Sequence, residues 1–526
     1  MINTVSSISL DLARWQFAST TLFHYIFVPL TLGLTPLVAI MQTKWHRTGD
    51  ERWLRLTKFF GTLLLINFAI GVATGLVQEF QFGMNWSGFS RYVGDIFGAP
   101  LAVEALGAFF LESTFLGLWI FGWDRLSPRV HLATIYAVWA GTWLSAFFIL
   151  TANSWMQHPV GYEMGSDGHV VATDIFAILF QKFVWFAVVH TLLAAFMTAA
   201  FFMLGVSCWQ IWKGKNPEVF RMAAKLAIIV AVPASAINLA WGSEFGVEAT
   251  NVQPMKIAAS EALWDTEQPA AFSLVQIGGF TESDQDPSFD IEIPRMLSFL
   301  ATNSFSGEVK GINQLQAEEE QKFGPGNYIP DVKMTFWSMR TMAYLGSLSF
   351  LIALIGAWLM WKDRFMEARW FHRLAIVGIF LPFLSNFAGW LLTEAGRQPW
   401  VVYGLLKTED AVSPSVSTGM VGASLGAFVL LYGGLACVEF WLGQAHARGI
   451  KIHLPKNTTL MDANTSRAAR LYGYDTLDVQ FDVSQDGALK IKFEPRATLP
   501  TAAEIEKNYD HSAPIAQQHL GPKETV

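Results

Sequence analysis

The 526-residue chain is poor in cysteine and in charge. Its two cysteines, Cys208 and Cys437, both fall in apolar stretches, which excludes a disulfide framework and a CxxCH haem attachment. Only 15% of the residues are charged and 52% are hydrophobic, whereas a soluble domain carries about 25% charged residues. The composition therefore predicts a polytopic membrane protein. A net charge of -7 argues against nucleic acid as a partner.

Long apolar runs dominate the chain, and we expect an all-α polytopic membrane protein with nine transmembrane helices. Lys and Arg gather in the loops after the first, third, fifth and seventh runs, so the positive-inside rule predicts an outer N-terminus and a cytoplasmic C-terminus. Asp11 and Arg14 precede the first run in place of a basic leader region, so we expect this segment to be retained. The runs are 16–41, 55–82, 96–122, 129–156, 179–212, 219–242, 335–361, 371–394 and 416–445.

These runs divide the chain into four regions. Helices 1–6 occupy residues 1–242, an extracytoplasmic loop residues 243–333, helices 7–9 residues 334–445, and a cytoplasmic polar tail residues 446–526. The loop is too long for a passive connection, and long ordered loops tend to be functional. In the tail, the alternating stretch DVQFDVSQDGALKIKFEP predicts a hairpin around Asp486-Gly487, to which we assign no chemistry.

The third run is apolar but carries two carboxylates, Glu104 and Glu112. A charge at the bilayer centre costs roughly 3 kcal/mol, so such an acid usually faces protein, a ligand or a proton path. Eight residues of helix separate the two acids by about 12 Å along the axis. They cannot both snorkel in the same direction, so both are functional candidates; the alternative is that one snorkels to a headgroup region and a neighbouring helix satisfies the other.

Two of the eleven histidines, His24 and His190, lie well inside apolar runs. In the predicted topology they share one outer layer with Glu104, Met342 and Glu394, whereas Glu112 lies deeper. His with Met is a low-spin haem pair that suits electron transfer, and His190 and Met342 fit it. His24, Glu104 and Glu394 would then serve metal centres with an open position. The alternative is that these side chains are satisfied by packing alone.

Other membrane redox proteins fit the residues less well. A haem–copper oxidase needs more intramembrane histidines than two, and a dihaem cytochrome b needs paired histidines about a dozen residues apart on two helices. Arg340, two residues before Met342, could pair with a haem propionate or snorkel outward. Two competing function classes remain: a haem-binding anchor that passes electrons to a partner without reducing oxygen, and a transporter, which leaves His190 and Met342 unexplained.

Six stretches carry a family resemblance: WQFASTTLFHYIFVPLTLG around His24, INFAIGVATGLVQEFQFGMNW, GDIFGAPLAVEALGAFFLESTF, ANSWMQHP, KFVWFAVVHT at His190, and GRQPW at 396–400. Together they resemble subunit I of the cytochrome bd-type quinol oxidases over nearly all of residues 10–445. GRQPW with the GAPLAxE helix is highly specific. The resemblance implies a quinol:dioxygen oxidoreductase that builds proton motive force without pumping.

The resemblance also implies the cofactors: one low-spin haem b, one high-spin haem b and one haem d. His190 and Met342 match the low-spin ligands, and Arg340 matches the arginine beside that haem. The other two haems take the remaining axial positions in an order that differs among members. The residues that match these positions or lie in GRQPW are His24, Glu104, Glu394 and Arg397.

The segment 243–333 corresponds to a short-loop form of the family's quinol loop, in which Lys256 and Glu261 match the quinol-oxidation residues. We expect the protons consumed by oxygen to arrive from the cytoplasm past Glu112 and Ser113 and then Glu104. The implied partners are quinol, dioxygen, the lipid bilayer and a second polytopic subunit, and a small single-span subunit is a further candidate. The implied location is the bacterial plasma membrane.

Overall fold

The computed structural model describes residues 7–447, 477–483 and 489–495. It divides the chain into two units, Met1–Tyr432 and Gly433–Val526. The first unit holds most of the long helices and all of the candidate site residues.

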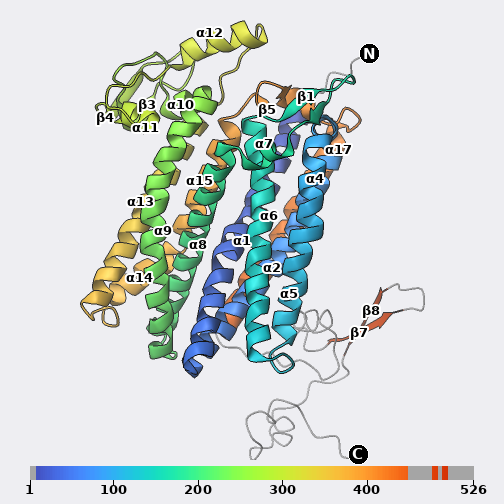
Figure 1. Cartoon of the computed structure of the whole chain (residues 1–526), viewed down its shortest axis with the longest axis vertical. Coiled ribbons are helices and arrows are strands. Elements are labelled where there is room, and N and C mark those ends of the chain that lie inside the picture. Colours follow the sequence, from blue (N-terminus) through green and yellow to red (C-terminus); the bar gives the residue numbers. More distant parts are fainter. Residues whose placement is uncertain (1–6, 448–476, 484–488, 496–526) are drawn as a thin grey trace, which may run out of the picture. The chain divides into compact units, whose positions relative to one another are not determined.

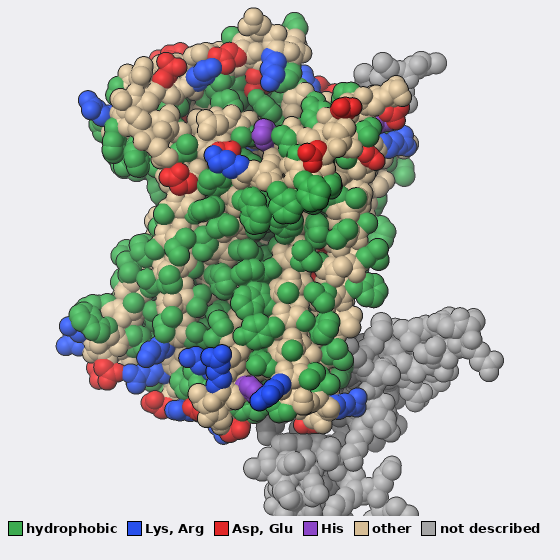
Figure 2. All heavy atoms as spheres, viewed as in Figure 1, with side chains coloured by type: hydrophobic (Ala, Val, Ile, Leu, Met, Phe, Trp, Pro, Cys, Tyr) green, Lys and Arg blue, Asp and Glu red, His purple; other side chains and the backbone are tan. Residues whose placement is uncertain are grey.

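Nine helices in the described part of the chain are long and apolar enough to cross a membrane. Each predicted apolar run falls on one of them, which confirms the predicted fold class. A broad apolar band separates two polar ends of the molecule (Figure 2). The helices are α1 (Ser7–Thr48), α2 (Glu51–Met84), α4–η1–α5 (Gly94–Phe121), α6 (Pro128–Gln157), α8 (Lys182–Trp212), α9 (Pro217–Val252), α13 (Val332–Trp361), α14–α15 (Arg369–Ala395) and α17 (Thr418–Ala447).

Local signals set several helix ends. The Asp331 side chain accepts a hydrogen bond from the Met334 amide at 2.9 Å and so begins α13, and Pro128 and Pro217 stand in the first turns of α6 and α9. Helix α9 continues ten residues beyond the predicted boundary at 242, despite its polar sequence there. Tertiary contacts hold this extension, because Glu248 pairs with Lys182 at 2.5 Å and Glu244 accepts a hydrogen bond from Asn303.

Two spans are interrupted. The third changes from α4 (Gly94–Val103) to a π-helical turn, η1 (Glu104–Phe109), and then to α5 (Phe110–Phe121). The eighth consists of α14 (Arg369–Gly378) and α15 (Phe380–Ala395). Single π-helical turns inside α-helices are frequent at functional sites, and η1 begins at one of the two predicted intramembrane acids.

The first eight spans pack as two groups of four (Figure 1). In one group α1 packs on α2 and α6, and α5 packs on α6; in the other α8 packs on α9, α9 on α13, and α13 on α15. Helix α1 also packs along α8 and joins the groups. A shared core of leucine, alanine and phenylalanine side chains fills the end away from α12.

Between α9 and α13 the chain forms a folded cap at one end of the helices (Figure 1). Strands β3 and β4 pair antiparallel, and helix α12 packs on α10. A small separate core joins this cap to the start of α13. It contains Trp264, Ile312, Leu315 and Phe336. We call residues 253–331 the interhelical segment. Its elements are α10 (Pro254–Glu261), β3 (Phe272–Gly278), β4 (Pro287–Ile293), α11 (Met296–Thr302) and α12 (Ile312–Phe323).

Short elements complete the first unit. They pair as small antiparallel ribbons, β1 with β2 and β5 with β6, or form single turns beside them. These elements are α3 (Ser87–Tyr92), β1 (Tyr162–Met164), β2 (Val170–Ala172), α7 (Ile175–Phe180), β5 (Trp400–Val402), β6 (Leu406–Lys407) and α16 (Thr408–Ala411).

The second unit contains the predicted hairpin. Strands β7 (Leu477–Val483) and β8 (Leu489–Pro495) pair antiparallel, which confirms the expectation from the alternating sequence. The predicted turn at Asp486-Gly487 lies outside the described residues.

Candidate functional site

A large cavity of about 1820 Å³ runs between the two groups of helices. Ligand pockets usually measure about 300–1,000 Å³, so this one has room for more than one large group. Of the predicted site residues, Arg340 and Ser113 lie outside its lining. The predicted site residues that line it are His24, Glu104, Glu112, His190, Lys256, Glu261, Met342, Glu394 and Arg397.

His24 faces the cavity from α1 with its ring oriented by α2. Its Nδ1 lies 3.0 Å from the Thr74 hydroxyl, and that hydroxyl lies 3.0 Å from the Ile70 and Gly71 carbonyl oxygens. Because the single hydroxyl proton goes to a carbonyl, Thr74 accepts the proton of Nδ1. The lone pair of His24 is then on Nε2, which is the state that ligates a metal.

His190 faces the cavity from α8 and is held differently. Among the described residues, its buried Nδ1 has no hydrogen-bond partner. The Phe245 ring lies 5.8 Å from its ring centroid, and a Cβ on Gly242 would stand 3.3 Å from its Cε1. A buried polar atom without a partner is rare in native structures and calls for a ligand or water.

Met342 and Glu394 approach the same cavity from α13 and α15. A Cβ on Gly389 would lie 2.9 Å from the Met342 sulfur, so the glycine lets this side chain pack closely against α15. Glu394 accepts hydrogen bonds from Asn153 at 2.8 Å and from Arg397. The carboxylate is therefore oriented by one amide and one guanidinium.

Two amides at the end of α6 extend this network to the interhelical segment. Lys256 donates to the Gln157 oxygen at 2.6 Å, and the Gln157 amide donates to Asn153 at 2.8 Å. Asn153 in turn contacts Glu394, so three hydrogen bonds link a cap residue to a cavity carboxylate. Sequence reasoning missed both amides, although they lie in the quoted ANSWMQHP stretch, where two polar residues close an apolar run.

The acids of the first group face the cavity from η1, α5 and α2. Glu104 accepts a hydrogen bond from Ser145 of α6, and the Glu112 side chain is buried. Glu79 of α2 lines the same cavity and was also missed; the signal was an acid near the end of an apolar run. Ser113 instead donates to the Phe109 carbonyl of its own helix at 2.7 Å.

Lys256 and Glu261 lie at the two ends of α10 and are both buried. Burial, and next the charge of Arg397, lower the pKa of Lys256 to about 7. Burial raises the pKa of Glu261, and the opposing pull of Arg340 does not cancel it. Arg340 pairs with Glu261 at 2.7 Å and gives its other donors to the carbonyls of Ser260 and Ser273. The sequence did not predict that Arg340 and Glu261 form one ion pair.

Comparison with known proteins identifies the family. The family model for cytochrome bd terminal oxidase subunit I matches residues 12–450. The chain belongs to that family.

The chain is 47% identical over 427 residues to cytochrome bd ubiquinol oxidase subunit 1 of Bacillus subtilis, covering 80% of this chain and 90% of the relative. It is 38% identical over 498 residues to cytochrome bd-II ubiquinol oxidase subunit 1 of Escherichia coli, covering 84% and 96%. It superimposes on the bd oxidase of Geobacillus thermodenitrificans with a TM-score of 0.77 at 28% identity, covering 86% of this chain and all of that one. The chain is therefore a multi-pass bacterial membrane protein.

Membership in a cytochrome bd family implies haem cofactors, and the cavity fits them. In the described part of the chain, no group of three or more His, Cys, Asp or Glu could hold a bare metal ion. The donors instead stand one by one around a wide cavity. This suits haem, because the porphyrin supplies four nitrogens and the protein adds only axial ligands. The proton on Nδ1 of His24 leaves its Nε2 free to ligate, and both histidines line the cavity.

Proposed function

We propose that this chain is the quinol-oxidising and dioxygen-reducing subunit of a respiratory terminal oxidase. One observation carries the proposal: single donors from five helices surround one cavity, and a buried lysine and a buried glutamate lie at its rim in α10. The names of similar proteins support the reaction, and they include both ubiquinol and menaquinol oxidases. The proposed substrate is therefore a quinol, a class that covers both ubiquinol and menaquinol.

Three haems are assigned to the cavity as two haem b and one haem d. His190 and Met342 would hold the low-spin haem b, and His24, Glu104 and Glu394 would hold the high-spin haem b and haem d. Arg397 has buried N–H groups beyond the one that pairs with Glu394, and with them it would neutralise haem carboxylates. When bound, the haems supply one-electron transfer from quinol to dioxygen.

The quinol site lies at Lys256 and Glu261. Glu261 accepts one proton, because burial raises its pKa toward the working range of a general base. Lys256 positions the other quinol oxygen, and Gln157 holds its ammonium or amine in place at 2.6 Å. Arg340 orients the Glu261 carboxylate and does not need to contact a haem to contribute.

The proposed reaction builds proton motive force because it releases protons on one side of the membrane and takes them up from the other. Quinol protons leave on the outer side, where the interhelical segment lies in the proposed topology. The protons for water come from the cytoplasm past Glu112 and Ser113 to Glu104. No pump is required, because electrons and protons reach oxygen from opposite faces. A second polytopic subunit and a small single-span subunit complete the proposed complex.

The test uses the chain assembled with its second subunit. Quinol should drive oxygen consumption, and the reduced-minus-oxidised spectrum should show a chlorin band from haem d. Lys256→Met or Glu261→Gln should lower quinol oxidation by about 100-fold or more, because each removes a group that holds or accepts a quinol proton. Artificial reductants should still reduce the haems of both variants.

Two results would contradict the proposal. A colourless complex would remove the haem assignment and with it the oxidase reaction. A coloured complex that passes electrons from quinol without consuming oxygen would instead indicate an electron-transfer anchor.

A further inference from the structure

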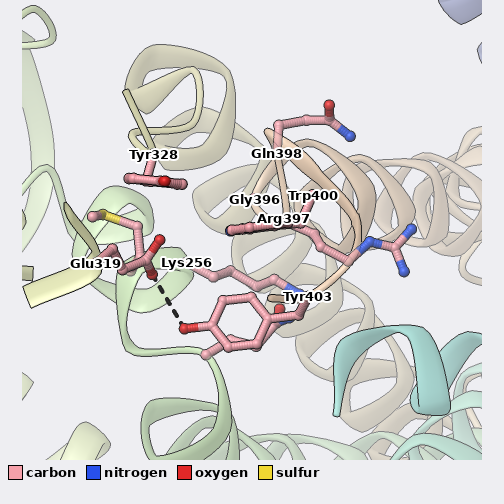
Figure 3. A pocket seen from close by; sticks show the side chains of 10 residues that line it. Lys256, Glu319, Tyr328, Gly396, Arg397, Gln398, Trp400 and Tyr403 are labelled. Atoms are coloured by element: carbon pink, nitrogen blue, oxygen red, sulfur yellow. Dashed lines mark hydrogen bonds between the residues drawn. The ribbon is translucent and has the colours of Figure 1, made fainter. Parts of the chain in front are cut away.

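A second, much smaller cavity adjoins Lys256 between α10, α12 and the β5–β6 turn (Figure 3). It leaves about 10 Å³ for the centre of a water molecule, which is enough for one water. Glu319 of α12, Tyr403 and Lys256 all line it (Figure 3). No residue of this cavity other than Lys256 and Arg397 belongs to the predicted site.

Buried polar atoms without partners converge on this small cavity. Among the described residues, no hydrogen-bond partner at ordinary distance is present for Glu319 Oε2 or Gln253 Oε1. Native structures leave few buried polar atoms unpaired, so two beside one space indicate bound water. Lys256 and Glu319 both line this polar space.

Glu319 occupies a position that an amphipathic helix normally gives to an apolar residue. Ile312, Leu315 and Glu319 form the buried stripe of α12, whereas Glu318 and Glu320 beside it are exposed. One carboxylate oxygen accepts the Tyr403 hydroxyl at 3.1 Å, and the other faces the cavity (Figure 3). An acid that is buried and half-satisfied in a cavity is a candidate for proton chemistry.

Burial raises the pKa of Glu319, while the Tyr403 hydroxyl, the Trp400 indole N–H and the charge of Lys322 act in the opposite direction. Lys407 extends over Tyr328, with its Nζ 4.8 Å from the ring centroid, and adds a cation near the same wall. The remaining charges that face the cavity are Lys256 and Arg397. Glu319 and Lys256 therefore both change protonation nearer to neutral pH than free side chains do.

We propose that Glu319 is a proton-relay carboxylate, which receives through water in the small cavity the proton that quinol gives to Lys256. This inference rests on the proposed quinol site. Oxidation of one quinol to quinone releases two electrons and two protons; the electrons pass on to the dioxygen-reducing centres. Glu261 takes one proton and the Lys256 amine takes the other. The ammonium then protonates the water, the water protonates Glu319, and Glu319 releases the proton to the aqueous side.

The experiment measures quinol-driven oxygen consumption against pH, from about 5 to 9, for the complex with its second subunit. Glu319→Gln should lower kcat about tenfold and leave KM within about twofold, since it removes a proton acceptor and keeps the side chain's shape. The relay needs a neutral Lys256 amine and a Glu319 carboxylate, so the normal rate falls as pH drops through the Lys256 pKa of about 7 and falls further through the raised pKa of Glu319. Glu319→Gln should keep the fall at Lys256 and lose the acid limb of Glu319. Glu320→Gln, an exposed neighbour, should behave like the unmodified enzyme.

A kcat and pH profile for Glu319→Gln equal to those of Glu320→Gln would overturn the relay. Should Glu319→Gln fail to assemble, Tyr403→Phe provides a second measurement. It removes the hydrogen bond that favours the carboxylate, so the acid limb should move to higher pH, and an unmoved limb would also overturn the relay. Lys256→Met separates the two proposals: if it is inactive while Glu319→Gln is normal, the relay alone is wrong, and if it stays active, the quinol site is wrong as well.

Discussion

The two walls of the large cavity present a histidine in different ways. On the α1–α2 wall, His24 donates to Thr74 and its tautomer is set by the protein alone. On the α8–α9 wall, His190 is positioned by packing against Phe245, and within the described residues its Nδ1 has no partner. A hydrogen-bonded ligand is oriented before its metal arrives, whereas a packed ligand takes its final orientation from the metal.

The walls also differ in charge. The wall formed by α2, η1 and α5 carries three acids, Glu79, Glu104 and Glu112. The wall formed by α8 and α13 contributes the neutral ligands His190 and Met342. Neutral ligands suit a haem that only transfers electrons, and acids suit a centre that must be supplied with protons. Four sets of variants test this contrast.

The largest effect is expected on the neutral wall. His190→Ala or Met342→Leu should abolish the low-spin haem signal and retain haem d, because each removes one of two axial ligands. Reduced-minus-oxidised spectra of the assembled complex measure both. His24→Ala is the matched change on the other wall and should retain the low-spin signal. Loss of the same band from His24→Ala and His190→Ala would show that the walls do not serve separate haems.

On the acidic wall, Glu112→Gln should reduce turnover by roughly 100-fold and leave the haem content unchanged, since the amide cannot carry a proton. Oxygen consumption with excess quinol and a haem assay on the same sample measure the two quantities. Thr114→Ala provides a neighbouring control, because that side chain is exposed on the same helix and lies outside the cavity lining. Unchanged turnover in Glu112→Gln would take this residue out of the proton path.

Thr74 accounts for the difference between the histidines. Thr74→Val keeps the shape but removes the acceptor of the Nδ1 proton, so haem retention at His24 should weaken about tenfold. Thr74→Ser restores the hydroxyl and should recover most of it. Haem loss during titration with a haem-binding apoprotein reports this without reference to activity. If valine and serine behave alike, the hydrogen bond does not orient His24.

The smallest effect comes from filling space behind each ring. A Cβ at position 75 would stand 3.0 Å from His24 Cε1, against 3.3 Å for position 242 and His190. His24 is also tied to Thr74 and cannot shift freely, so Gly75→Ala should lower thermal stability more than Gly242→Ala, by about 1 kcal/mol or more. Thermal unfolding of the two variants gives the comparison. A larger loss from Gly242→Ala would reverse the assignment of the rigid histidine.

Several features of this site could not be predicted from sequence. Arg340 pairs with Glu261 across 79 positions, and Lys256 meets Gln157 across 99. Such pairs depend on how the interhelical segment folds back over the helices, which no local pattern specifies. Helix α9 likewise runs past its predicted end because Asn303 and Lys182 hold the polar extension. Thr74 and Glu319 look ordinary in the sequence, and only their neighbours make them candidates.

The nine predicted spans and the donor set follow from the sequence alone, because an unpaired polar side chain in hydrocarbon costs free energy, which makes His24, Glu104 and His190 conspicuous. The tertiary structure alone decided which donors share a cavity, which tautomer His24 holds and where Glu319 lies. Those outcomes follow from helix packing and hydrogen-bond geometry between residues far apart in the chain, and bilayer energetics do not act on them.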